Sequence, residues 1–257
     1  MCNNNVLELR ERVIHVTSDE RSINWEWEKN SEHVNRQIQF VSIDDIPSIR
    51  SNTNVVLPSE IQEGDILIKH PFEPNTYISV NDASNEIHKD KWFKISEIAQ
   101  CLGATGFTIE EAKESIESRT LDAKLGIKYK TVRSKSDVKK EETLKEKLGV
   151  KISDKFGGCR KITDNSYLEA KELAIKYHLD NDSAIRSLIR MRNPSKENML
   201  TNRSIHCEMT KELNSALDIA FSLNVMPKVF SLDTNVKRTL ETKETITLDV
   251  LFEFPDN

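Results

Sequence analysis

Glycine and proline are scarce in this chain. Each occurs 7 times in 257 residues, and the only adjacent glycines are Gly157 and Gly158. Proteins that hold phosphate groups with backbone amides place glycines in clusters. The scarcity of glycine therefore argues against a nucleotide-binding enzyme.

Paired cysteines and long apolar runs are also lacking. The 4 cysteines are scattered with no C-x-x-C spacing, which is typical of free thiols in a reducing cytosol. Cys101 and Cys207 lie among apolar neighbours, so we expect both to be inert core residues. No apolar run approaches the ~20 residues of a membrane-spanning helix, and no signal-peptide pattern is visible. The sequence predicts a cytoplasmic protein, with peripheral membrane association as the alternative.

Recognisable catalytic and metal-binding motifs are missing as well. None of the 6 histidines stands at a metal-ligand spacing from another, and none neighbours a pair of cysteines. His206 adjoins Cys207, but adjacent residues of a strand face opposite sides and cannot chelate together. No G-x-S-x-G elbow or cysteine-nucleophile motif occurs. We therefore expect no metal and no cofactor, and the sequence favours a protein without enzymatic activity.

The best enzymatic candidates are His70 and Glu73. They stand in a turn framed by Pro71 and Pro74. A histidine beside a carboxylate can serve as a general base whose tautomer the carboxylate fixes. The alternative is that the prolines shape a structural turn that His70 caps. The sequence favours this structural role.

A doubled motif stands out among the features that are present. KLGIK at residues 124–128 returns as KLGVK at residues 147–151. In both copies apolar residues alternate with lysines, as a half-buried strand requires. Residues 124–161 hold 13 lysines and arginines but only 5 aspartates and glutamates, in a chain whose net charge is −5. The sequence predicts a long basic β-hairpin over 124–161, with an exposed polar tip.

A basic surface on an acidic protein can bind an anionic partner. The alternative is that these lysines only prevent aggregation of the strand edges. The candidate binding residues are basic side chains of the hairpin and of one following helix: Lys124, Lys128, Lys130, Arg133, Lys147, Lys151, Lys155, Arg186 and Arg190.

The two helices predicted at 167–177 and 185–191 have the spacing of a helix-turn-helix. Arg186, Arg190 and Arg192 would point outward from the second helix, where arginine can contact guanine in the major groove. However, Asp180 and Asp182 in the connection would repel phosphate, and the linker suits a cap for the second helix. The pattern therefore favours an ordinary helical hairpin over a DNA-binding motif.

The remaining pattern predicts an α+β protein. Further helices are expected at 92–102 and 213–223, and the tract 110–119 is expected to leave a strand as helix or loop. The best strand pattern, at 245–254, is typical of the centre of an antiparallel sheet. Other strands are expected at 13–16, 37–43, 66–68, 77–80, 107–109, 204–209 and 228–232. The prediction is a single domain over 1–257 with a twisted antiparallel sheet, helices grouped on one side, and 1–30 as a peripheral segment.

Three functions fit these features. The first is an interaction or assembly protein whose basic hairpin contacts an acidic protein partner. The second is a pore-forming-like effector whose amphipathic hairpin strands insert into an anionic membrane on forming a homo-oligomer. The third is nucleic-acid binding through the hairpin and the Arg186 helix. The sequence favours the first.

Overall fold

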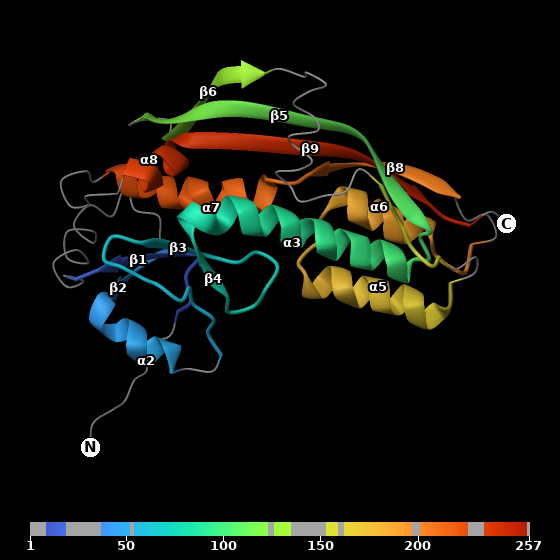
Figure 1. Cartoon of the computed structure of the whole chain (residues 1–257), viewed down its shortest axis with the longest axis horizontal. Coiled ribbons are helices and arrows are strands. Elements are labelled where there is room, and N and C mark those ends of the chain that lie inside the picture. Colours follow the sequence, from blue (N-terminus) through green and yellow to red (C-terminus); the bar gives the residue numbers. More distant parts are fainter. Residues whose placement is uncertain are drawn as a thin grey trace. The chain divides into compact units, whose positions relative to one another are not determined.

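The structure is a computed structural model that describes residues 9–18, 37–51, 54–122, 126–134, 153–158, 162–196, 201–225 and 234–255. Helices and two mostly antiparallel sheets make up this part of the chain, which confirms the α+β class (Figure 1). The predicted strand at 228–232 lies outside the described residues, as does the segment at 1–8 and 19–36.

The residues group into two compact units. Unit 1 comprises Met1–Ser84, Ile116–Val132 and Glu212–Lys243, and unit 2 comprises Asn85–Ser115, Arg133–Lys211 and Glu244–Asn257. Five elements contribute residues to both units: α3 (Val80–Cys101), β5 (Gly106–Asp122), β6 (Gly126–Ser134), α7 (Lys211–Phe221) and β9 (Thr242–Glu253). This grouping therefore does not test the prediction of a single domain.

Unit 1 contains a four-stranded sheet in the order β2-β1-β3-β4. Its central strand, β1 (Val13–Thr17), runs parallel to β2 (Ile38–Ser42) and antiparallel to β3 (Ile66–Lys69), which pairs with β4 (Tyr77–Ser79). All five residues of β1 are buried, so both faces of this strand are covered. These strands lie where the sequence predicted them.

One face of this sheet packs against η2 (Ile43–Asp45) and α2 (Ile46–Arg50). The Ser42 hydroxyl accepts a hydrogen bond from the Asp44 amide, and Pro47 occupies the first turn of α2, where its missing N–H costs no hydrogen bond. Unit 1 also includes most of α7 (Lys211–Phe221), with η3 (Ser222–Val225) and α8 (Thr234–Glu241). The core cluster on the α2 side consists of Leu9, Ile14, Val16, Val41, Ile46, Ile49, Leu67 and Tyr77.

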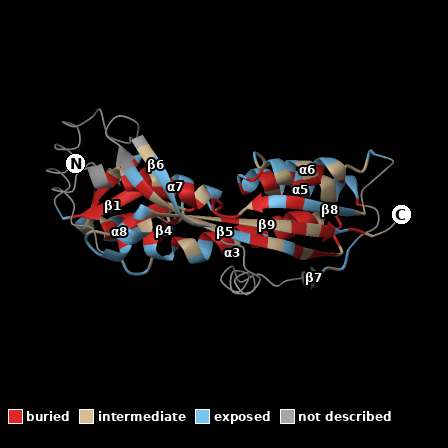
Figure 2. Ribbon diagram, turned by 90° about the horizontal axis from the view of Figure 1, so that it is seen from above, coloured by how far each residue is buried: buried red, intermediate tan, exposed pale blue. Residues whose placement is uncertain are grey.

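The second sheet has the order β6-β5-β9-β8, and β7 also pairs with β5. Its members include β6 (Gly126–Ser134), β7 (Ser153–Lys155) and β8 (Asn202–Glu208). β9 lies between β5 and β8 and alternates strictly: Ile246, Leu248, Val250 and Phe252 are fully buried, whereas the residues between them are half-buried (Figure 2). This confirms the prediction that the strand at 245–254 lies inside an antiparallel sheet.

The sequence prediction for residues 110–119 is wrong. This tract is rich in glutamate, lysine and alanine, which favour helix. In the structure it forms the middle of β5, a continuous strand of 17 residues. Because β5 lies between β6 and β9 in the sheet, pairing with neighbouring strands overrides the local preference.

Unit 2 combines its part of the second sheet with α3, α5 (Asp164–Lys176) and α6 (Ser183–Met191), which lie on one side of that sheet (Figure 1). Trp92 of α3 meets Phe107 of β5 edge to face, with ring centroids 4.7 Å apart. Asp182 caps α6, because its Oδ1 accepts hydrogen bonds from the amides of Ala184 and Ile185 at 2.9 and 3.3 Å. The capping role predicted for this linker is confirmed.

Helix α3 begins at Val80, well before the predicted start near residue 92. Its early turns bury Ala83 and Ile87 together with His88 and Lys91. The Lys91 Nζ donates to the backbone carbonyl of Glu208 at 2.6 Å and lies 3.9 Å from an Asp182 oxygen. Polar residues on the buried face interrupt the apolar spacing by which a helix is recognised in the sequence.

His178, two residues after the end of α5, has a strained backbone conformation, and this gives a stability prediction. His178 has φ 55°, a left-handed conformation that glycine adopts at little cost and other residues avoid. His178 is also exposed. We expect His178→Gly to raise the free energy of unfolding by about 0.5–1 kcal/mol, measured by urea denaturation with circular dichroism. His178→Ala is the control, because alanine keeps the strain; an equal gain from alanine would contradict the explanation.

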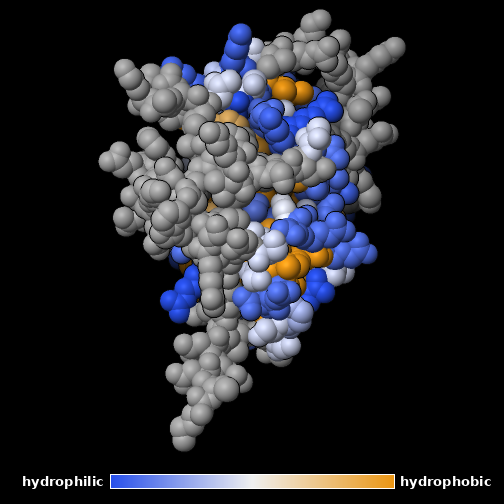
Figure 3. All heavy atoms as spheres, turned by 90° about the vertical axis from the view of Figure 1, so that its left-hand side faces the viewer, coloured by the Kyte–Doolittle hydropathy of each residue, from blue (hydrophilic) through white to orange (hydrophobic). Residues whose placement is uncertain are grey.

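The described residues on the face shown in Figure 3 are mainly polar. In the side shown in Figure 3, apolar side chains appear as small separate areas among charged and polar ones. None of the helices in the described part of the chain has the length and apolar character needed to cross a membrane.

Candidate functional site

The described part of the basic segment consists of two strands, β6 and β7. β6 is at one end of the described order of the second sheet. The Thr120 hydroxyl of β5 donates to the Lys128 carbonyl of β6 at 3.3 Å. β7 pairs antiparallel with β5, with Lys155 opposite Gly106. The described strands of the basic segment are thus each held by β5, and the pairing of the two motif copies with one another lies outside the described residues.

Within β6 the side chains alternate between two environments. Lys128 and Lys130 are exposed and share one face, because successive strand residues point to opposite sides. Tyr129 points to the other face, where its hydroxyl donates to Asp218 of α7 at 2.8 Å. The ammonium group of Lys243 lies 3.9 Å from the centroid of the Tyr129 ring. β6 therefore presents its two lysines on the face away from α7.

Asp218 is held in turn by a buried arginine. Arg119 of β5 is 2% exposed, and its Nε donates to Asp218 at 2.7 Å. Its Nη2 donates to the Asn214 side chain at 2.9 Å, and its Nη1 donates to the backbone carbonyls of Leu240, at 3.2 Å, and Thr242. Arg119 thus joins β5 to α7 and to the junction of α8 with β9.

The environment of Tyr129 keeps its hydroxyl protonated. Burial raises its pKa to about 12, with further contributions from the hydrogen bond to Asp218 and from the charge of Asp218. At neutral pH the hydroxyl is therefore a permanent donor to Asp218. Because Asp218 also pairs with Arg119, the middle of β6 is fixed to the body of unit 1.

Positive charge on the α7 side of β6 is balanced within unit 1. Arg119 pairs with Asp218, and Lys243 lies 3.6 Å from a carboxylate oxygen of Glu117. On the opposite side, Lys128 and Lys130 place two cations next to each other along one strand face. β6 therefore contacts α7 through one face and carries two exposed lysines on the other.

The other predicted binding residues are distributed over both units. Lys155 in β7 is exposed, as are Arg186 and Arg190, which share one face of α6. The backbone of Arg133 belongs to β6. Lys124, Lys147 and Lys151 lie outside the described residues.

The outward placement predicted for Arg192 is wrong. Arg192 is 2% exposed; its Nε donates to the Leu102 carbonyl at 3.1 Å, and its guanidinium lies 4.3 Å from the centroid of the Phe254 ring. Leu102 follows the last residue of α3, so Arg192 supplies a cation where the helix dipole is negative. Arg192 is thus a structural residue of unit 2.

His70 occupies the turn after β3 and is buried, with 7% exposed. Its Nδ1 accepts a hydrogen bond from the Phe72 amide at 3.3 Å, and its ring meets the Phe72 ring edge to face. The Glu73 side chain is exposed. This geometry favours the structural role of capping the turn.

A polar pair that the sequence analysis did not identify lies on β8 and β9. His206 and Asp249 are opposite each other in register, with 2.7 Å between Nδ1 and Oδ1. His206 is exposed and Cys207 is buried, which confirms that they face opposite sides. No group of three or more histidine, cysteine or acidic side chains in the described residues is placed to hold a metal ion. We interpret the pair as a cross-strand contact that favours the observed register.

Sequence analysis also missed the support beneath β6. Arg119 is separated from Asp218 by 99 positions and from Asn214 by 95. Single residues so far apart leave no local pattern. The only sequence feature that pointed to this network was Arg119 itself, and it lies in the tract 110–119, whose structure was predicted wrongly.

Comparison with known protein families, with curated proteins and with solved structures finds no match to this chain.

Proposed function

We propose that this protein is a non-enzymatic interaction protein that contacts an acidic protein partner through its basic segment 124–161. The observation that carries the proposal is β6, the end strand among the described strands of its sheet, which exposes Lys128 and Lys130 on one face and is anchored on the other through Tyr129. A sheet edge can bind an extended segment by adding it as a further strand.

The chemistry of such a partner follows from the spacing of the lysines. Side chains two positions apart on an added strand lie on the same face as Lys128 and Lys130. Acidic side chains there would form cross-strand pairs with the lysines, whereas basic ones would be repelled. The partner is therefore an extended segment with acidic residues at alternate positions. Basic residues at the sheet edge also disfavour pairing of one copy of β6 with another.

A direct test uses a labelled peptide in which glutamate alternates with valine. We expect Lys128→Glu with Lys130→Glu to weaken its binding about tenfold or more, because two attractive pairs become repulsive. The control is Lys89→Glu with Lys196→Glu, which makes the same change in net charge at two exposed lysines elsewhere. Fluorescence anisotropy at a fixed salt concentration measures both.

Three outcomes would overturn the proposal. If both double variants lose affinity equally, the binding reflects net charge and not β6. If methylation of the peptide's backbone nitrogens leaves its affinity unchanged, the segment does not add as a strand. If the protein prefers phosphatidylserine vesicles or duplex DNA over the peptide, the membrane or nucleic-acid hypothesis is favoured instead.

A further inference from the structure

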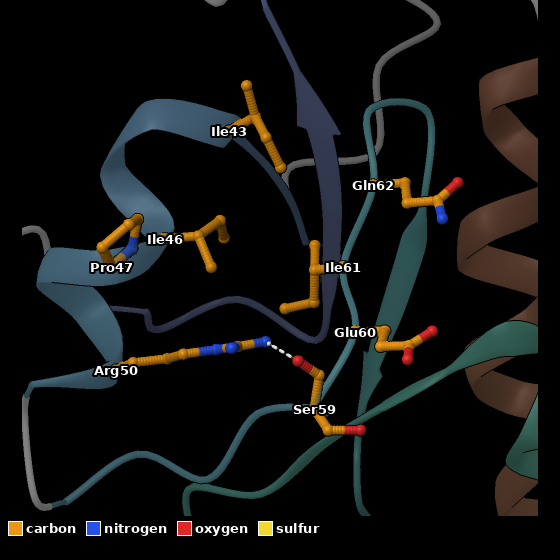
Figure 4. A pocket seen from close by; sticks show the side chains of 8 residues that line it. All are labelled: Ile43, Ile46, Pro47, Arg50, Ser59, Glu60, Ile61 and Gln62. Atoms are coloured by element: carbon orange, nitrogen blue, oxygen red, sulfur yellow. Dashed lines mark hydrogen bonds between the residues drawn. The ribbon is translucent and has the colours of Figure 1, made fainter.

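Unit 1 contains a cleft of about 390 Å³ between α2 and the loop that precedes β3. Its walls are formed by Ile43, Ile46, Pro47 and Arg50 on one side and by loop residues 59–62 on the other (Figure 4). A volume in this range is sufficient for a small molecule. The cleft is separate from β6 in sequence, and no residue of the basic segment lines it.

One part of the cleft is apolar and rigid. The side chains of Ile43, Ile46 and Ile61 lie around the same space (Figure 4). Ile46 belongs to the core cluster of unit 1, and Ile43 and Ile61 pack against that cluster. The apolar wall is thus an extension of the core, so it does not have to be ordered when a ligand binds.

The loop across the cleft is fixed at both ends. Arg50 Nη2 donates to the carbonyls of Pro58 and Ser59 at 2.5 and 2.6 Å. Further along, the backbone N–H of Gln62 donates to the carboxylate of Asp65 at 2.7 Å. These contacts fix the position of the loop relative to α2 without a ligand, so the cleft is preformed.

The guanidinium of Arg50 keeps donors for a ligand. Its two hydrogen bonds to the loop use only Nη2, and no described residue accepts a hydrogen bond from Nε or Nη1. The side chain of Glu60 points away from Arg50 (Figure 4). The cleft therefore combines an aliphatic wall with one cation, whose remaining N–H donors can make a charge-assisted hydrogen bond to a carboxylate.

We propose that this cleft binds a short aliphatic carboxylate, with its hydrocarbon chain against Ile43, Ile46 and Ile61 and its carboxylate on Arg50. An uncharged molecule of the same length would pack against the apolar wall but would gain no charge-assisted hydrogen bond from Arg50. A cationic one would be repelled by Arg50. The preference for the anion is the property that identifies the site.

The test uses three probes of equal length, hexanoate, hexanol and hexylamine, with isoleucine methyl groups observed by NMR. We expect hexanoate to shift the methyl signals of Ile43, Ile46 and Ile61 and to bind about tenfold more tightly than hexanol, with hexylamine weakest. In Arg50→Met, hexanoate and hexanol should bind equally. Lys89→Met is the matched control, because it removes one positive charge from an exposed side chain outside the cleft, and it should leave the preference unchanged.

Arg50→Met also removes the contacts that hold the loop, so a measurement on the unaltered protein accompanies it. Raising the salt concentration should weaken hexanoate binding while leaving hexanol binding unchanged, because only the carboxylate contact is screened. The proposal would be overturned if hexanol bound as tightly as hexanoate or if the preference did not change with salt. It would also be overturned if hexanoate shifted the methyl signals of other isoleucines first.

Discussion

Replacing Arg119 with methionine is expected to lower the free energy of unfolding by about 3–5 kcal/mol, because it leaves the partners of a buried cation unpaired. Methionine preserves most of the volume but none of the five N–H donors. Asp218, Asn214 and two backbone carbonyls would each lose a hydrogen bond in a largely buried setting. Denaturation in urea, followed by circular dichroism, measures the loss.

Two further variants separate charge from geometry. Arg119→Lys keeps the charge, but one ammonium group cannot reach partners on α7 and at the α8–β9 junction together, so its loss should be intermediate. Combining Arg119→Met with Asp218→Asn should cost less than the sum of the two single losses, because the two residues share one interaction.

The control for Arg119 is Lys113→Ala. Lys113 pairs with Glu111 at 2.7 Å on the same strand, but both side chains are exposed. Exposed pairs contribute little to stability, so no measurable change is expected. A loss for Arg119→Met as small as that of Lys113→Ala would show that the buried network does not stabilise unit 1.

The second large effect is a loss of stability at acidic pH. His15 lies on the central strand β1, opposite Phe40 of β2 and Ile66 of β3, and is 4% exposed. Burial lowers its pKa from 6.5 to about 4, a shift that the charge of Glu63 partly opposes. The folded protein therefore resists protonating a side chain that the unfolded chain protonates readily.

The direction of the pH dependence follows from proton binding. Above pH 6.5 neither state carries this proton, and the stability of unit 1 does not depend on His15. As the pH falls from 6.5 towards 4, the unfolded state binds a proton that the folded state does not, so stability is lost. The accumulated loss is about 3 kcal/mol, and it stops growing below pH 4.

Hydrogen exchange of the β1 and β3 amides at a series of pH values, corrected for the intrinsic exchange rate, measures this loss. His15→Gln should remove it, whereas Thr17→Val, a change at a buried position of the same strand, should keep it. Titration of the His15 ring by NMR with a midpoint near 6.5 would contradict the explanation, as would a glutamine variant that keeps the full pH dependence.

Prediction from sequence succeeded where one local pattern matched one environment. β9 alternates between a buried and a half-buried face from Ile246 to Phe252, and its period of two is visible in the residues themselves. Helices α5 and α6 were found from their apolar stripes, and the cap at Asp182 from its residue type. In each case the local preference and the tertiary position agree.

Prediction failed where the tertiary position overrides the local preference. The composition of residues 110–119 favours a helix, but the tract is a strand, because β5 lies between β6 and β9 in the sheet. The first half of α3 was missed because the buried Lys91, whose ammonium donates to the carbonyl of Glu208, interrupts its apolar spacing. Arg192 was placed outward because an arginine near the end of an amphipathic helix gives no sign that it packs against Phe254.

The sequence by itself determined the α+β class, the alternation of β6 and the concentration of positive charge in 124–161, because composition and period are properties of neighbouring residues. Only the tertiary structure decided that Tyr129 is anchored on Asp218 and that Arg119 holds Asp218, since those partners are about a hundred positions apart. The cleft at Arg50 likewise exists only because the fold brings α2 against the loop before β3. Long-range contacts of this kind depend on the complete packing of the chain, which no local pattern contains.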